Sequence, residues 1–133
     1  LFRSVSAHPY FLEIAHQKVS SHFLITRHGE LIQFVSTKNK AWHAGVSSFQ
    51  GREKCNDFSI GIELEGLEGE CFEDAQYMRL TTLCQDLHQH YPIAHVAGHE
   101  HIAPGRKQDP GPGFDWPRLV SALDFPHRYF PVA

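Results

Sequence analysis

Residues 98–112 read GHEHIAPGRKQDPGP, and the rest of the chain is organised around this stretch. Its prolines and glycines interrupt any repeating pattern of backbone hydrogen bonds, so we expect a loop of fixed shape and neither a helix nor a strand. Loops held on a rigid scaffold are frequent sites of chemistry. Within this loop, His99 and Asp109 offer an imidazole nitrogen and a carboxylate oxygen, a pair of ligands that suits zinc.

Upstream of the loop, residues 58–64 (FSIGIEL) form the strongest predicted strand, because large apolar residues occupy every second position. The other face carries only Ser59, Gly61 and Glu63, which leaves space above it, as on the floor of a cleft. Glu63 is therefore a candidate functional carboxylate, with Glu65 beside it on the same face. A solvent-facing strand carboxylate is the alternative of equal weight.

Residues 74–90 form the clearest predicted helix, since apolar residues recur at i, i+3, i+4 and i+7 from Leu80 onward, a stripe that indicates core packing and not a cofactor site. The other expected elements are, in chain order, a short helix over 9–18, strands over 22–27 and 31–35 joined by a turn at Gly29, an irregular stretch over 36–57, a short strand over 94–97, and a helix capped by Asp115 that runs to about Leu123. This order predicts a mixed α/β fold, a central mixed β-sheet flanked by helices. We expect one domain over residues 1–133, with an irregular tail at 124–133.

The composition excludes several classes of protein. A chain of 133 residues fits one domain, and 41% hydrophobic with 20% charged residues is typical of a folded globule. A net charge of −3 and a pI near 6.4 provide no field that would attract nucleic acid or an acidic membrane. We therefore expect no nucleic-acid or membrane partner. The expectation of a small-molecule ligand comes from the motifs described below, and we expect a monomer.

The cysteines indicate the compartment. Cys55, Cys71 and Cys84 are an odd number and form no CxxC pair, which favours a reducing environment over a disulfide framework. No signal peptide is visible from Leu1 onward, so we expect a cytoplasmic location.

The candidate residues suggest hydrolysis assisted by a metal. A catalytic zinc needs three protein ligands and one open position for water, and His99 and Asp109 supply two of the ligands. Zinc lowers the pKa of a bound water toward neutrality. Amide hydrolysis also needs a proton carrier, for which Glu63 is suited, and a cation for the developing oxyanion, for which Lys107 is suited. A solvated basic turn is the alternative for Lys107 and Arg106.

Four long motifs resemble those of AmpD-type N-acetylmuramoyl-L-alanine amidases: GHEHIAPGRKQDPGPGFDW, FSIGIELEG, AWHAGVSSFQGREKCNDFS and VSSHFLITRHGELIQ. The resemblance runs almost continuously from His8 to Leu123. It implies the zinc amidase fold shared with peptidoglycan recognition proteins, a mixed sheet flanked by helices, which agrees with the order of elements.

The resemblance also implies roles for individual residues. His99 and Asp109 match two of the three zinc ligands, Glu63 matches the catalytic acid/base, and Lys107 matches the lysine that stabilises the tetrahedral intermediate. The family's third ligand is a His in an N-terminal strand, and no matching motif occurs after Leu1. We therefore expect that strand and the loop after it to precede this sequence.

The same resemblance assigns Trp42, Lys54, Lys18 and Arg106 to the surface that holds the sugar and the stem peptide. Lys18 lies where relatives often carry Arg, which favours a weaker carboxylate contact there. From pattern alone, Trp42 is as well explained as a plug at the rim of the core as it is as a ligand platform.

The expected function is that of a zinc-dependent amidase of cell-wall recycling. It would cleave the amide between (1,6-anhydro-)N-acetylmuramic acid and the L-alanine of the stem peptide. The alternative is a non-catalytic muropeptide-binding module, which the absent third ligand favours, whereas Glu63 and Lys107 argue against it. The choice between anhydro-muropeptide and intact murein, and the diamino acid of the stem, stay open.

Overall fold

The computed structural model describes residues 2–5, 21–67 and 70–131. The helix expected over residues 9–18, and with it Lys18, lies outside these ranges. No helix within the described ranges is long and apolar enough to cross a lipid bilayer.

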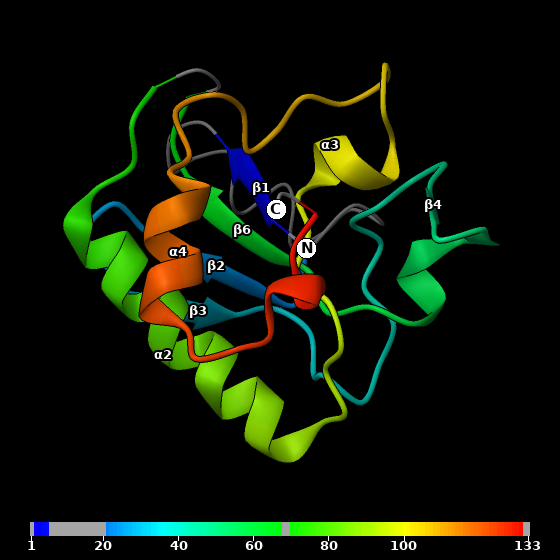
Figure 1. Ribbon diagram of the computed structural model, residues 1–133, viewed down its shortest axis with the longest axis horizontal. Helices are drawn as coiled ribbons and strands as arrows, with labels where there is room; N and C mark the ends of the chain where they lie inside the picture. Colours follow the sequence, from blue (N-terminus) through cyan, green and yellow to red (C-terminus); the bar gives the residue numbers. More distant parts are fainter. Residues whose placement is uncertain (1, 6–20, 68–69, 132–133) are drawn as a thin grey trace.

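A four-stranded mixed sheet forms the centre of the molecule, in the order β1-β6-β2-β3 (Figure 1). Strand β6 (Ile62–Glu65) runs parallel to β1 (Phe2–Val5) on one side and to β2 (Phe23–Ile25) on the other. Strand β3 (Leu31–Gln33) pairs antiparallel with β2, as the predicted hairpin requires. Gly29 in the turn has φ 84°, a conformation that glycine adopts without a steric cost. The prediction of a mixed sheet is confirmed.

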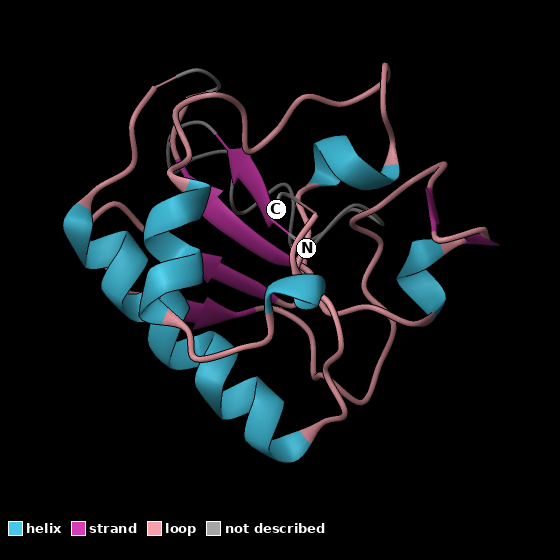
Figure 2. Ribbon diagram, in the orientation of Figure 1, coloured by secondary structure: helices cyan, strands magenta, loops and turns pink. Residues whose placement is uncertain are grey.

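Helices α2 (Asp74–His90) and α4 (Trp116–Ala122) cover one face of this sheet (Figures 1 and 2). Helix α2 has the predicted bounds, and its apolar stripe packs on the strands. Burial raises the pKa of the Cys84 thiol in this stripe to about 12, which fits a core residue and not a reactive one. The main core cluster comprises Phe23, Ile25, Ile62, Leu64, Phe72, Tyr77, Leu80, Leu83, Cys84, Val96, Phe114, Trp116, Leu119, Leu123 and Phe130.

The start of α4 follows the prediction. Asp115 is the N-cap, and its side chain accepts a hydrogen bond from Arg118 N at 3.1 Å. The backbone N–H of Asp115 donates to the Tyr77 hydroxyl at 2.8 Å, which joins the cap to α2. Helix α4 is thus fixed at its first turn to the longer helix beside it.

The predicted strand over 58–64 is wrong in its first half. Strand β6 begins only at Ile62. Of the residues before it, Gly61 still accepts the N–H of Phe23 at 3.1 Å, but residues 58–60 are not part of the strand. Phe58 does not share the core face of β6, because it packs in a small separate cluster with Ala44 and Ile102. The alternation of apolar residues in the sequence therefore covers more residues than the strand itself.

The strand predicted over 94–97 is also absent from this described segment. The N–H of Val96 donates to the carbonyl of Tyr129 at 2.8 Å, so the segment is held by the C-terminal tail. That tail contains a short 3-10 helix, η2 (His127–Tyr129), and buries Phe130 in the core, but is otherwise irregular, as expected.

The loop of residues 98–112 contains a one-turn helix, α3 (His99–Ile102), which contradicts the expectation that it holds no helix. Its prolines begin only at Pro104, so one turn fits between Gly98 and the first of them. The irregular stretch 36–57 is likewise interrupted by short elements: β4 (Ser48–Phe49), β5 (Arg52–Glu53) and η1 (Cys55–Asp57). In Figure 1, α3 and β4 lie on the side of the molecule away from α2.

Candidate metal site

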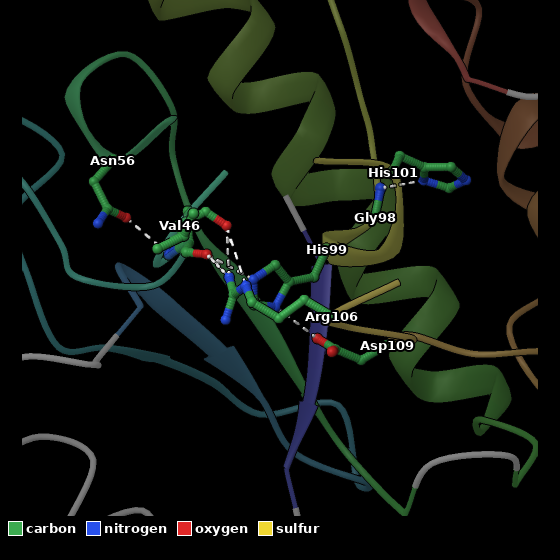
Figure 3. Close-up of polar contacts among 8 residues, drawn as sticks. Val46, Asn56, Gly98, His99, His101, Arg106 and Asp109 are labelled. Carbon is green, nitrogen blue, oxygen red and sulfur yellow. Dashed lines mark hydrogen bonds and ion pairs between the residues drawn. The ribbon is translucent and has the colours of Figure 1, made fainter. Parts of the chain in front are cut away.

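His99 and Asp109, the two predicted ligands, lie side by side. Helix α3 carries His99 and the loop that follows it carries Asp109, so their side chains meet across the turn of residues 103–108 (Figure 3). His99 Nδ1 is 3.2 Å from Asp109 Oδ2, and the two side chains are 3% and 15% exposed. Both groups are therefore almost withdrawn from water, where an ionic or metal contact is strong.

The other nitrogen of the His99 ring has a backbone partner. His99 Nε2 is 2.8 Å from the carbonyl oxygen of Ala44, which can only accept, so Nε2 carries a proton. In the neutral ring Nδ1 then has a lone pair that faces the Asp109 carboxylate. Two acceptors at this distance repel each other unless a proton or a metal cation lies between them. The pair thus fits a zinc ligand set in chemistry and in orientation.

A third ligand is not found in the part of the chain that the structure describes. There, no group of three or more His, Cys, Asp or Glu is placed to hold a metal. Of the other nearby histidines, His101 points away from the pair and its Nδ1 accepts the N–H of Gly98 at 2.9 Å (Figure 3). Burial lowers the pKa of His101, which also packs edge-on against Trp116. His101 therefore caps α3.

Glu63 lies in the centre of β6 and is fully buried, at 0% exposed. The alternative of a solvent-facing carboxylate is therefore wrong. Ile62 and Leu64 on either side point into the core under α2, so Glu63 stands on the opposite face of the sheet. A buried carboxylate on a central strand is held in one orientation, as a proton carrier requires.

The space predicted above the small residues before Glu63 is partly filled. A Cβ on Gly61 would lie 2.5 Å from Cγ of His43, so the imidazole rests directly on this glycine. His43 Nε2 is 3.2 Å from the hydroxyl of Ser59, which itself donates to the carbonyl of Cys55. The small residues on this face make room for the His43 ring. The prediction that this face is the open floor of a cleft is therefore wrong here.

A second buried imidazole supports the same region. His22 Nδ1 accepts the N–H of Gly61 at 3.0 Å, and His22 Nε2 donates to the carbonyl of Asn39 at 2.7 Å. Its ring lies edge-on to His43, with 6.0 Å between centroids. Burial lowers the pKa of His22, so the neutral ring is the form that the fold holds.

The predicted residues for substrate and oxyanion that fall within the described ranges differ in exposure. Trp42 is 45% exposed with Lys40 Nζ 4.8 Å from its ring centre, which favours a platform over a plug of the core. Lys54 and Lys107 are exposed. Arg106 instead donates to the carbonyls of residues 44 and 46, both at 2.8 Å from Nη2.

The sequence-based prediction missed His22, His43 and Asn56 as members of the site. Gly61 was the available signal, because a glycine in a strand often marks the close approach of another group. The carboxamide oxygen of Asn56 accepts the N–H groups of residues 43 and 44, and a lone Asn in an irregular stretch has no pattern that would reveal this.

Comparison with known proteins places the chain in a family. The family model Amidase_2, described as N-acetylmuramoyl-L-alanine amidase, matches residues 2–112. The 1,6-anhydro-N-acetylmuramyl-L-alanine amidase AmpD of Salmonella typhimurium (strain SL1344) is 57% identical over 115 residues, which are 85% of this chain and 62% of that protein. The chain thus spans less than two thirds of that relative.

Solved structures agree with the fold. A crystal structure of a selenomethionine derivative of AmpD is 45% identical, with a TM-score of 0.82 over 92% of this chain and 82% of that one. The Escherichia coli amidase AmiD, in complex with the substrate anhydro-N-acetylmuramic acid-L-Ala-D-gamma-Glu-L-Lys, is 33% identical, with a TM-score of 0.83 over 91% of this chain and 55% of that one. The family match and these similarities confirm the resemblance seen in the four motifs: the chain belongs to the N-acetylmuramoyl-L-alanine amidase family.

Proposed function

We propose that this chain carries the catalytic site of a zinc-dependent amidase of cell-wall recycling. Its substrate is the amide between the lactyl group of 1,6-anhydro-N-acetylmuramic acid and the L-alanine of the stem peptide. The name of the Salmonella relative and the ligand of the AmiD complex support this substrate class.

The observation that carries the proposal is the arrangement of His99. Its Nε2–H is bonded to a backbone carbonyl, and its Nδ1 faces the Asp109 carboxylate at 3.2 Å. These two residues would hold zinc together with a ligand from outside the described residues. When bound, zinc acts as a Lewis acid and makes a water nucleophilic near neutral pH.

The remaining roles belong to side chains of this chain. Glu63 takes the proton of the attacking water and delivers it to the leaving amine of L-alanine as the C–N bond breaks. Lys107 provides positive charge for the oxyanion that forms on the lactyl carbonyl. Trp42 offers an apolar surface to the sugar, and Lys54 offers charge to the carboxylates of the stem peptide.

The test of this proposal is Glu63→Gln in the full-length protein. Gln has nearly the same shape and fits the buried site without a cavity, but cannot carry the proton. Turnover of anhydro-muropeptide should fall by about 100-fold or more, with zinc content unchanged. Glu30→Gln, at an exposed turn, is the matched control and should retain full turnover. Retained turnover in Glu63→Gln would exclude this residue as the proton carrier.

A non-catalytic muropeptide-binding module is the second candidate, because only two of the ligands lie together among the residues described. Metal analysis of the purified full-length protein separates the two functions. Stoichiometric zinc with turnover excludes the module, and tight muropeptide binding without zinc excludes the enzyme.

We place the protein in the cytoplasm, where a soluble recycling substrate would be available, and expect a monomer. The cysteines support this compartment, because Cys55, Cys71 and Cys84 are all free.

A further inference from the structure

We propose that Asn56 is a positioning residue for the metal site: through the backbone of residues 43 and 44, it determines which nitrogen of His99 is available to a cation. This inference rests on the proposed function, since it concerns the same ligand pair. It assigns a role to a residue that contacts neither His99 nor Asp109 in any hydrogen bond seen here.

The carbonyl oxygen of Ala44 is the centre of this arrangement. It accepts a hydrogen bond from His99 Nε2 at 2.8 Å and another from Arg106 Nη2 at 2.8 Å. Ala44 is fully buried, so water does not replace either donor. A carbonyl oxygen has two lone pairs, and both are used here.

Two sets of contacts hold this carbonyl in place. On its N-terminal side, Asn56 Oδ1 accepts the N–H of His43 at 3.0 Å and that of Ala44 at 2.8 Å. On its C-terminal side, Gly45 has φ 63° and Arg106 bonds to the carbonyl of Val46. The close fit of the guanidinium requires that glycine, because a Cβ there would lie 2.9 Å from Arg106 Nη2.

The state of the His99 ring follows from the position of the carbonyl. With the acceptor in place, a neutral ring carries its proton on Nε2 and turns its Nδ1 lone pair toward Asp109. Without it, Nε2 loses its partner, and a proton on Nδ1 can instead be donated to Asp109 Oδ2, 3.2 Å away. That proton would occupy the side of the ring from which a metal is bound. Asn56 thus prevents the two ligands from bonding to each other in place of a cation.

The direct test is to find which nitrogen of His99 carries the proton in the zinc-free full-length protein, measured by two-bond 1H–15N correlation. In the wild type, His99 Nε2 should carry the proton. In Asn56→Ala, Nε2 should become the unprotonated nitrogen. Asn56→Asp keeps the acceptor oxygen and should restore the wild-type pattern, and Asn39→Ala, at an exposed asparagine, should leave it unchanged.

The second measurement is zinc affinity of the full-length protein, by competition with a chromophoric chelator. Asn56→Ala should weaken it by about 10-fold or more, as the loss of a partner behind a metal ligand typically does. If the Ala variant does not fold, Asn56→Ser replaces it, because a hydroxyl is too short to accept both N–H groups.

An unchanged His99 tautomer in Asn56→Ala overturns the inference, even if zinc binds more weakly. A changed tautomer with wild-type zinc affinity overturns its consequence for the metal. Failure of the wild type to bind zinc would refute the proposed function instead, and the tautomer comparison would still test the role of Asn56.

Discussion

Gly61 shows how the absence of one side chain shapes the site. The His43 ring rests on it, at a distance where a Cβ would be only 2.5 Å from Cγ. A larger residue would push His43 away from the sheet, and the adjoining Ala44 carbonyl would move with it. At residue scale, therefore, the glycine of FSIGIEL affects the position of the candidate ligand His99, which lies far from it in the chain.

His22 gives a prediction at the same scale. In the folded protein its Nδ1 accepts the N–H of Gly61, and burial lowers its pKa. In the unfolded chain it binds a proton near the ordinary value of about 6.5. The unfolded state therefore takes up more protons as the pH falls below this value, and the free energy of unfolding should decrease as the pH falls below about 6.5.

Denaturant unfolding from pH 8 downward measures this effect. His22→Gln should show a shallower decrease with falling pH than the wild type, whereas His28→Gln, at an exposed turn, should follow the wild type. Equal slopes for His22→Gln and the wild type would show that another group titrates.

At the scale of elements, α2 stabilises its shorter neighbour. Helix α4 has 7 residues, too few to be stable in isolation. The Asp115 cap, the contact of this residue with the Tyr77 hydroxyl, and the packing of Trp116 and Leu119 in the core hold α4 in place. The two helices together cover the apolar face of the sheet, which leaves the opposite face to Glu63.

A pair of substitutions in α2 tests this packing. Leu80 is 0% exposed and Met78, on the same helix, is 69% exposed. Leu80→Ala should lower the free energy of unfolding by about 2–5 kcal/mol through lost burial and a residual cavity. Met78→Ala, measured by the same denaturant titration, should change it by about 0.5 kcal/mol or less. Similar losses for both variants would contradict the assigned orientation of the helix.

Elements with a strong periodic signal were predictable, and those held by tertiary contacts were not. Helix α2 was predicted with its observed ends, because its apolar stripe stops at Tyr91-Pro92. Helix α3 was missed because the prolines and glycines of its loop hide a single turn. The extended segment at Val96 resembles a strand in sequence, but its backbone partner is the tail residue Tyr129, which no local pattern indicates.

At the scale of the whole molecule, the sheet separates packing from chemistry. One face buries the core under α2 and α4, and the other carries Glu63. The metal-ligand pair comes from α3 and its loop, and the segment of residues 43–46 ties this loop to the entrance of β6. His99, Asp109 and Glu63 are candidates from sequence, since each is a charged or ligating side chain in a distinctive motif, and the structure brings His99 and Asp109 together. The part played by residues 43–46 could not be predicted, because these residues act through backbone groups.

Zinc should therefore stabilise the fold as a whole. A ligand that binds only the folded state adds about 2.7 kcal/mol at 100 times its dissociation constant. We expect zinc to raise the thermal unfolding midpoint of the full-length protein, and the chelator EDTA to reverse the rise. His99→Ala should abolish the response, and magnesium, which prefers oxygen ligands, should not produce it. An equal zinc response in His99→Ala would place the metal elsewhere.

The acceptor that orients His99 has one more consequence, which concerns genetics. The oxygen of Ala44 belongs to the main chain, so each of the twenty amino acids at position 44 would supply it. A mutational scan would detect the residues that hold this group in place and would never remove the group itself. Only a chemical change of the backbone reaches it: an ester in place of the peptide bond between Ala44 and Gly45, introduced by semisynthesis, weakens the carbonyl as an acceptor while every side chain stays the same.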